Sequence, residues 1–341
     1  MQEQIANWGI GINLGNSLDA IGGETAWGNP PITQEMIHMF AAAGFNMLRI
    51  PTTWAGHFGD APDYAVDPAW MDRVQQVVDW ALKEGLRVIL NTHHEQNLWL
   101  RTDLKSLRKV MPAFVALWEQ IAARFADYDD MLIFQGLNEP RIEGGADEWN
   151  GATPEVRAAV NALNAAFVDT VRESGGRNAE RWLCIPTVGA QITAPGLESL
   201  IIPEDDKLIV TVHSYKPERF VLDHHEVGTT PFFGPEEEAE LDRVFALLKE
   251  FRLAHPTVPL MLTEHGAVSK PIDSQGQRND VDRANFEQAF LSRAAAMGIP
   301  CIYWDNNYYS AGDEWFGLFD RQTLQCNSSK VLEAMLPYRA K

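Results

Sequence analysis

The stretch LIFQGLNEP, residues 132–140, begins as an apolar run and ends in polar residues. A short apolar run that stops at a polar cluster is typical of a strand buried on both faces. Such strands occur in parallel sheets, where helices cover one face and the other face packs into the interior. The stretch therefore predicts a parallel strand whose carboxyl end carries Asn138 and Glu139.

Seven further runs of this kind occur along the chain, and most are near-continuously apolar before they end in polar residues. They are IGINLGN from Ile10, MLRIP from Met47, RVILNTH from Arg87, WLCIPTVG from Trp182, LIVTVHSY from Leu208, PLMLTEHG from Pro259 and CIYWDNN from Cys301. Segments with a helical period separate them. In residues 69–83, for example, the apolar positions 70, 74, 77 and 81 form one stripe. The first of these helices has Thr33 as its predicted N-cap and Gly44 at its end.

Eight strands in strict alternation with helices predict a single (β/α)8 barrel, because right-handed crossovers close into a barrel at eight strands. No Ser-, Gly- or Pro-rich linker interrupts the pattern, so we expect one domain over residues 1–341. Longer insertions follow three strands, at 141–153, 216–235 and 306–316. In such a barrel all three lie at the C-terminal face, where active sites are built.

The composition narrows the class of partner. The formal net charge is −19, from 47 acidic and 28 basic residues, and a field of this sign repels nucleic acid and anionic membranes. A neutral polysaccharide is compatible with this charge, although acidity also serves solubility alone. The three cysteines, at positions 184, 301 and 326, have no metal-like spacing and exclude a disulfide scaffold. No run approaches the roughly 18 apolar residues of a transmembrane helix.

Polar and aromatic side chains at the strand ends form the candidate site. They are Arg49, His93, Asn138, Glu139, His213, Tyr215, Glu264 and Trp304. Side chains at the C-terminal ends of barrel strands converge on one cleft. Two of them, Glu139 and Glu264, are carboxylates from the fourth and seventh strands. Glycoside hydrolysis requires such a pair, because one group protonates the leaving oxygen and the other attacks the anomeric carbon or activates water.

The two carboxylates need unequal environments. We expect Arg49 to hold Glu264 ionised through a charge-assisted hydrogen bond, with a second hydrogen bond from Tyr215. The negative charge of Glu264 would then raise the pKa of Glu139 and keep it protonated as the acid. Asn138 has the amide donor that can bind a sugar 2-hydroxyl in the transition state.

The same residues allow other hypotheses. An isolated Asn-Glu-Pro also occurs in helix-capping turns, but here it ends an apolar strand and TEHG follows three strands later. A metal-dependent barrel hydrolase could use ligands from the set His93, His94, His213, His265 and Asp305. The first strand lacks the His-x-His pair that such enzymes commonly use, so we expect no metal. A glycan-binding barrel without catalysis would have lost a carboxylate, and both are present.

The eleven tryptophans divide by position. Trp70, Trp80 and Trp118 lie in helical patterns and are predicted core residues. Trp27, Trp54, Trp99, Trp149 and Trp315 follow strand ends, where an exposed indole can stack on a sugar ring or pack under its own loop. The pair His224–His225 is a predicted surface pair in a loop.

Several motifs resemble one family when they are taken together. LNEP at 137–140 resembles the acid/base motif of glycoside hydrolase family five, the cellulase-like barrels of clan A. The others follow in family order: GINLGNSLDA at 11–20, TAWGNP at 25–30, AAGFNMLRIPTTW at 42–54, NTHHE at 91–95, HSY at 213–215, WDN at 304–306 and FGLFDR at 316–321. Together they resemble subfamily four, which contains endoglucanases and xyloglucan-active enzymes. The resemblance spans Gly9 to Arg321.

The resemblance implies roles by position. Arg49 matches the arginine that binds the nucleophile, Glu264 matches the nucleophile, and Glu139 matches the acid/base. Asn138 matches the residue that binds the sugar 2-hydroxyl.

The remaining matches line the site. His93 matches the histidine of the −1 subsite with His94 behind it, and His213 and Tyr215 match the pair that flanks the carboxylates. Trp304 matches the platform under the −1 sugar. Trp27 and Trp54 are further candidates for substrate binding.

Three positions depart from the family pattern. Gln135 stands where strand four often carries Glu or a small apolar residue. His265 replaces the usual Phe after the nucleophile, and we expect that it can change the pKa of Glu264. Asn307 replaces a common glycine, which leaves the shape of the eighth loop open.

The sequence therefore predicts a retaining endo-β-1,4-glucanase that acts on cellulose, mixed-linkage glucan or xyloglucan by double displacement and needs no cofactor. A xyloglucan-specific enzyme, a β-mannanase or a xylanase on the same scaffold remains the alternative. We expect a monomer with a β-glucan polysaccharide or oligosaccharide as its partner, and neither nucleic acid nor membrane. Because a polymer cannot enter the cell, we expect a secreted or periplasmic protein whose signal peptide is absent from this sequence.

Overall fold

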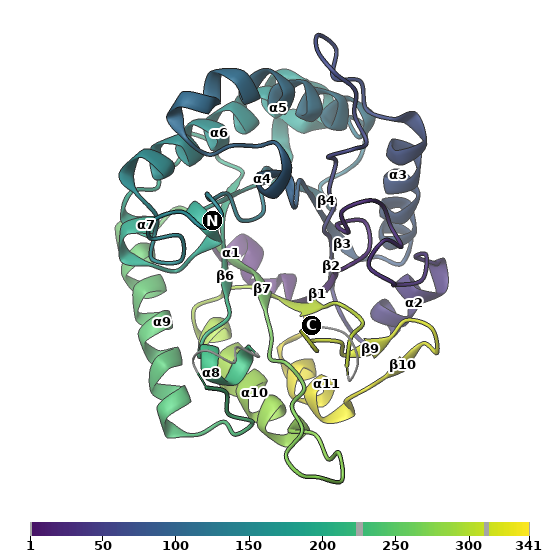
Figure 1. Cartoon of the computed structure of the whole chain (residues 1–341), viewed down its shortest axis with the longest axis vertical. Coiled ribbons are helices and arrows are strands. Elements are labelled where there is room, and N and C mark those ends of the chain that lie inside the picture. Colours follow the sequence, from purple (N-terminus) through teal and green to yellow (C-terminus); the bar gives the residue numbers. More distant parts are fainter. Residues whose placement is uncertain (1, 223–227, 310–313, 341) are drawn as a thin grey trace.

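The computed structural model describes residues 2–222, 228–309 and 314–340. Its centre is a closed barrel of eight parallel strands in sequence order, ringed by helices (Figure 1). The strands are β1 (Ile10–Leu14), β2 (Met47–Ile50), β3 (Arg87–Asn91), β4 (Leu132–Gln135), β5 (Leu183–Pro186), β6 (Leu208–Ser214), β7 (Leu260–His265) and β8 (Cys301–Asp305). Each predicted run contains its strand, so the prediction of a (β/α)8 barrel is confirmed.

Helices occupy the crossovers between strands. The longer ones are α2 (Gln34–Ala42), α3 (Pro68–Lys83), α5 (Leu104–Arg124), α6 (Pro154–Glu173), α9 (Pro235–Ala254) and α10 (Asp280–Ala296). The shorter ones are α1 (Gln2–Ile5), α4 (Glu95–Leu98), α7 (Ala194–Glu198), α8 (Glu218–Val221) and α11 (Ser329–Met335). A small antiparallel pair, β9 (Phe319–Asp320) and β10 (Gln325–Cys326), follows β8.

Local signals in the sequence explain where these helices lie. The Thr33 hydroxyl caps α2 by accepting the backbone N–H of Met36, and Gly44 takes the left-handed φ of 100° that ends the turn. The predicted apolar stripe of residues 70, 74, 77 and 81 is buried on α3 against the barrel. None of the described helices has the length and apolarity needed to cross a membrane.

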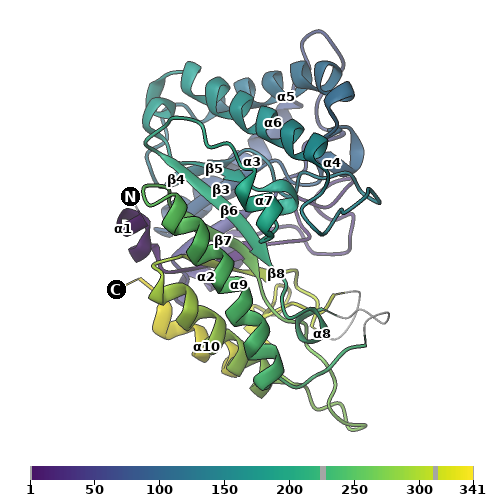
Figure 2. The same ribbon diagram turned by 90° about the vertical axis from the view of Figure 1, so that its left-hand side faces the viewer.

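The inside of the barrel is layered. Its lower layer is apolar and includes Met47, Ile89 and Met261, and it is closed from below by Ile5 and Trp8. The segment that carries these two residues begins with α1, at the end of the barrel where the strands start (Figure 2). Side chains in a strand alternate between its faces, so the next inward positions along the strands form a second layer. That layer is polar and lies directly beneath the site.

Strand β7 contains one residue more than its neighbours require. Val212 pairs with Leu262, but His213 pairs with Glu264, which leaves Thr263 as the extra residue. The pairing of β7 with β8 shows the same irregularity. A bulge of this kind interrupts the alternation of side chains, so that Thr263 and Glu264 both face the barrel interior.

The described residues of the three predicted insertions lie in the connections after β4, β6 and β8. The predicted surface pair His224–His225 lies outside the described residues.

Candidate active site

Glu264, at the carboxyl end of β7, is buried with 5% of its surface exposed. Its Oε1 accepts a hydrogen bond from Arg49 Nη1 at 2.7 Å, and its Oε2 accepts one from the Tyr215 hydroxyl at 2.9 Å. Burial raises the pKa of Tyr215, and the charges of Glu264 and Glu139 raise it further. Tyr215 therefore remains a neutral phenol whose hydroxyl donates the hydrogen bond to Glu264. Both predicted contacts of Glu264 are present.

Arg49 lies fully buried on β2 and donates to four oxygen atoms. One belongs to Glu264, and the other three belong to amide side chains. The amide contacts are Nε to Gln135 at 2.8 Å, Nη1 to Asn13 at 2.8 Å and Nη2 to Asn138 at 2.6 Å. The guanidinium is therefore fixed in orientation from several sides.

Glu139 follows β4 and reaches the opposite side of the same cleft. Its Oε1 lies 2.8 Å from His213 Nδ1, and its Oε2 accepts a bond from Arg141 Nη1 at 3.2 Å. Burial alone would raise the pKa of Glu139, but the hydrogen bond from His213 and the positive charges of His213 and Arg141 outweigh it and lower the pKa. The prediction of a raised pKa was therefore wrong, because it counted only the charge of Glu264.

His213 connects the two carboxylates. The Nδ1 that contacts Glu139 also lies 3.4 Å from Glu264 Oε2. One oxygen of each carboxylate and a nitrogen of His213 all lie within 4.8 Å of one another. The residues predicted from strands four, six and seven therefore meet at one point.

His93, His94 and Trp304 lie along the same cleft. The His93 ring is stacked parallel to Trp304, with 5.8 Å between ring centroids, and its Nε2 lies 3.3 Å from Asn138 Nδ2. Burial and nearby positive charges lower the pKa of His93 well below its usual value, and burial is the main cause that lowers that of His94 to about 4. Both rings are therefore neutral near pH 6 and offer one donor and one acceptor each.

The loop tryptophans behave in different ways. Trp54 is fully buried, and its indole N–H donates to the Asn91 carbonyl at 3.0 Å. The prediction that Trp54 contacts substrate was therefore wrong, since a sugar ring cannot reach it. Trp27 is 36% exposed with its ring 5.5 Å from His94, and Trp149 is 53% exposed.

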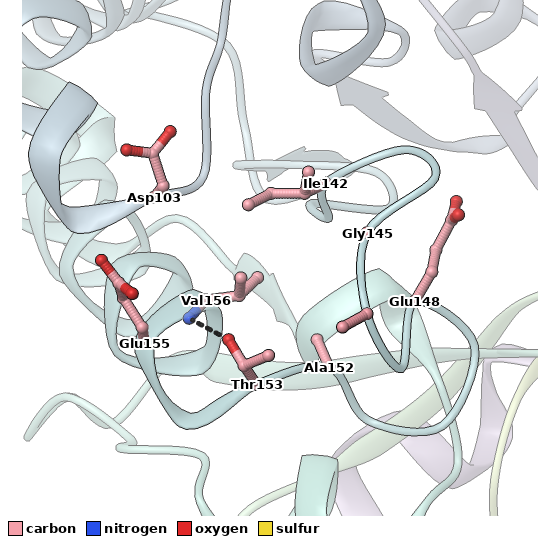
Figure 3. Close-up of a pocket in the computed structure, with 9 residues that line it drawn as sticks. Asp103, Ile142, Gly145, Glu148, Ala152, Thr153, Glu155 and Val156 are labelled. Carbon is pink, nitrogen blue, oxygen red and sulfur yellow. Dashed lines mark hydrogen bonds between the residues drawn. The ribbon is translucent and has the colours of Figure 1, made fainter.

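Trp149 belongs to the ordered loop that follows Glu139. Its ring lies under the Arg141 guanidinium at 4.5 Å, and the same guanidinium binds Glu148 at 2.8 Å. A hollow of about 100 Å³ behind this loop is lined by Ile142, Ala152, Val156 and their neighbours (Figure 3). The catalytic candidates do not line this hollow, so we attribute it to the packing of the loop on α6.

Two of the departures from the family pattern are explained by their contacts. The His265 ring faces outward, where it stacks on Phe290 and pairs with buried Glu287 at 3.0 Å. It therefore lies on the side of β7 opposite to the cleft. Asn307 has a φ of 71°, a conformation that Gly and Asn adopt more readily than other residues. Its side chain donates to Asn29 and accepts from the Arg321 backbone, which fixes the eighth loop.

The five residues considered as ligands for a metal-dependent hydrolase do not come together at one point. Asp305 pairs with Arg321 at 2.8 Å, and His265 lies outside the barrel. Among the described residues, two groups bring three possible ligand atoms within 4.8 Å: Asp19 with His93 and His94, and His213 with the two carboxylates. Both carboxylates of the second group already contact cationic side chains.

Some residues of the site were not predicted. Asn13 on β1 accepts a hydrogen bond from Arg49, and Arg141 after β4 donates one to Glu139. Glu95 is 1% exposed and accepts hydrogen bonds from the Trp54 backbone and the Trp99 indole. Their position in the sequence could have identified two of these residues. Glu95 belongs to the motif NTHHE at 91–95 and Arg141 directly follows NEP, so both come just after the end of a predicted strand.

This geometry defines a class of enzyme. Two carboxylates lie close together at the C-terminal face of a barrel, one paired with an arginine and the other with an imidazole. The Tyr215 hydroxyl donates to one of the two carboxylates, and the neutral His93 ring nearby is stacked on Trp304. Glycoside hydrolases use this combination to exchange groups at an anomeric carbon.

Comparison with known proteins gives the family. The model of the Cellulase family (glycosyl hydrolase family 5) matches residues 13–310. Endoglucanase A of Ruminococcus albus is 42% identical over 98% of this chain and 91% of its own length. The chain belongs to glycosyl hydrolase family 5, the cellulase family.

Solved structures agree with this assignment. A broad-specificity endoglucanase of subfamily four from Clostridium acetobutylicum has a TM-score of 0.91 and 35% identity, with 98% of both chains covered. A xyloglucan-specific endo-β-1,4-glucanase from a metagenomic library, in complex with cellotriose, has a TM-score of 0.92 and 36% identity, with 99% of both covered. The predicted family and subfamily resemblance is confirmed.

Proposed function

We propose that this protein is an endo-β-1,4-glucanase that cleaves glucan chains with retention of anomeric configuration. The observation that carries the proposal is the spacing of the carboxylates, with an oxygen of Glu139 and one of Glu264 within 4.8 Å. Retaining enzymes place their carboxyl groups about 5–5.5 Å apart, whereas inverting enzymes need about 6.5–9.5 Å to admit a water molecule. The names of the relatives, endoglucanases in each case reported above, support the reaction class.

The contacts of Glu264 support its role as nucleophile. Arg49 and Tyr215 each donate a hydrogen bond to one oxygen of Glu264 and so fix the orientation from which it can attack the anomeric carbon. The leaving oxygen takes a proton from Glu139 in the same step. Glu139 then removes a proton from water, which attacks the glycosyl-enzyme and releases Glu264.

The lowered pKa of Glu139 requires a source for the first proton. His213 and Glu139 are joined by a 2.8 Å hydrogen bond, so one proton can reside on either group. We propose that the pair carries this proton in the free enzyme and that it moves to Glu139 when a sugar excludes water from the cleft.

The substrate class is a β-1,4-glucan backbone. Trp149, beside Arg141, and Trp27, beside His94, are exposed indoles in loops that follow different strands. Exposed indoles near the site can stack on sugar rings, which suits a substrate of several sugar units. The relatives described as broad-specificity and as xyloglucan-specific leave mixed-linkage glucan and xyloglucan as further substrates.

Two further properties of the enzyme are its cellular location and its oligomeric state, and a polymer substrate would have to be met outside the cytoplasm. We propose that the enzyme acts outside the cytoplasm and as a monomer. Size-exclusion chromatography with light scattering tests the second point, and an apparent mass near twice the 38.2 kDa of the chain would contradict it.

The test of the function is a set of initial rates on carboxymethylcellulose, lichenan, xyloglucan, xylan and mannan. Glu264→Gln and Glu139→Gln serve as matched variants, and proton NMR of the first products reports the anomeric configuration. Glucan hydrolysis that gives the β-anomer first and disappears in Glu264→Gln supports the proposal. The α-anomer as first product would refute retention, and a preference for mannan would refute the substrate class.

A further inference from the structure

The buried charge of Arg49 faces one carboxylate and three neutral amides. Among the described residues, its hydrogen-bond acceptors are Glu264 and the side chains of Gln135, Asn13 and Asn138. Amide oxygens accept hydrogen bonds from a guanidinium and so fix its orientation. Because amides carry no net charge, they do not neutralise its positive charge. Glu264 is therefore the one carboxylate in direct contact with this charge in the described part of the chain.

Gln135 presents its oxygen to Arg49 for a structural reason. Its Nε2 donates to Thr211 Oγ1 at 3.0 Å and lies 3.5 Å from Thr263 Oγ1. With the amide nitrogen directed to these hydroxyl groups, the carbonyl oxygen faces Arg49 Nε. All these groups are fully buried inside the barrel, so that solvent does not screen their charges.

We propose that Gln135 is a positioning residue that orients Arg49 without sharing its charge, so that Arg49 stabilises the ionised form of Glu264 alone. The proposal rests on the proposed role of Glu264 as nucleophile. A carboxylate at position 135 would occupy the same space as the amide but give Arg49 a second anionic partner. The two carboxylates would then compete for one buried cation, and a larger share of Glu264 would be protonated at acidic pH.

Other titratable groups lie around Arg49 and Glu264, and two of them, His93 and His94, are kept neutral mainly by burial. Glu264 is faced by Arg49 from β2, by His213 and Tyr215 from the end of β6, and by Glu139 across His213. Cys184 on β5 lies near Arg49, and burial raises its pKa, so that it remains a neutral thiol. A second anion at position 135 would therefore act mainly through Arg49.

The experiment compares Gln135→Glu and Gln135→Met with the wild type. Threonine hydroxyls can accept from an amide or donate to a carboxylate, so the fold can accommodate the Glu side chain. We measure kcat and KM on a soluble β-glucan from pH 4 to pH 9, with melting temperatures over the same range. Gln288→Glu, on the exposed face of α10, adds one negative charge away from the site as a control.

We expect the acid limb of the Gln135→Glu profile to move to higher pH by about one unit, which is a roughly tenfold loss of kcat/KM at pH 5 that narrows toward pH 8. Gln135→Met removes the acceptor without adding charge, so its kcat should fall by about the same factor at every pH, with KM little changed. Gln288→Glu should match the wild type.

A Gln135→Glu acid limb that overlies the wild-type limb would overturn the proposal. So would a Gln135→Met variant with wild-type kcat, and this result decides the matter if Gln135→Glu does not fold. A wild-type enzyme without glucanase activity would instead refute the proposed function, and it is identified before either variant is compared.

Discussion

Glu95 is expected to lower the free energy of unfolding of this enzyme as the pH rises. Its carboxyl is 1% exposed and accepts the Trp54 backbone N–H at 2.5 Å. Burial raises its pKa from 4.5 to about 7, against the lowering effect of these hydrogen bonds. In the unfolded chain the same group ionises near 4.5, so the folded protein binds more protons between these two values.

The sign and size of the effect follow from proton linkage. Stability falls with rising pH wherever the folded state binds more protons. The interval from 4.5 to about 7, at about 1.4 kcal/mol per pH unit, corresponds to about 3 kcal/mol. Glu95→Gln cannot ionise, so its free energy of unfolding relative to the wild type should rise by about 3 kcal/mol between pH 4 and pH 8.

Urea unfolding of both proteins at half-unit pH steps measures this difference. Glu119→Gln, on the exposed side of α5, controls for the change in net charge. The reasoning fails if the Glu95→Gln and wild-type curves stay parallel across this range. It also fails if the free energy of unfolding of Glu95→Gln relative to the wild type falls with rising pH. In that case the hydrogen bonds to the ionised Glu95 would stabilise it by more than its burial destabilises it.

Three further outcomes are expected. Arg141→Ala removes a positive charge that lowers the pKa of Glu139, so the alkaline limb of kcat/KM should move up by as much as about one pH unit; a downward shift in the pH profile would contradict this. His265→Phe leaves Glu287 buried without its partner and should reduce the free energy of unfolding by about 3–5 kcal/mol, while kcat at low temperature stays near wild type; a loss of kcat in the folded variant would show that the ring acts on the cleft. Trp54→Phe deletes a buried indole hydrogen bond and should cost about 1–3 kcal/mol of stability without changing KM for cello-oligosaccharides; a raised KM at unchanged stability would place the indole in the substrate site.

The barrel could be predicted from the sequence because its signal is repeated. Each strand is a short apolar run that ends in polar residues, and burial on both faces produces that pattern wherever the strand lies in the barrel. The convergence of Arg49, Glu139 and Glu264 followed from the same rule, since parallel strands place their carboxyl ends at one face.

Individual environments could not be predicted because they depend on contacts between distant segments. Trp54 and Trp149 both follow strand ends, yet one is fully buried and the other 53% exposed. The pKa of Glu139 is set by His213 and Arg141 at distances that only the folded chain defines.

The extra residue in β7 has a consequence for protein engineering. Thr263 contacts Gln135 beneath the site, and the next residue, Glu264, is the proposed nucleophile. In a regular strand these two consecutive side chains would point to opposite faces. A graft of these side chains onto an idealised eight-stranded scaffold would therefore direct the carboxylate outward, toward the helices. Removing one residue before Glu264 would do the same in the natural chain. The site therefore depends on the bulge in β7 as well as on its side chains. A relative whose aligned sequence has a gap within 260–265 would lack this bulge.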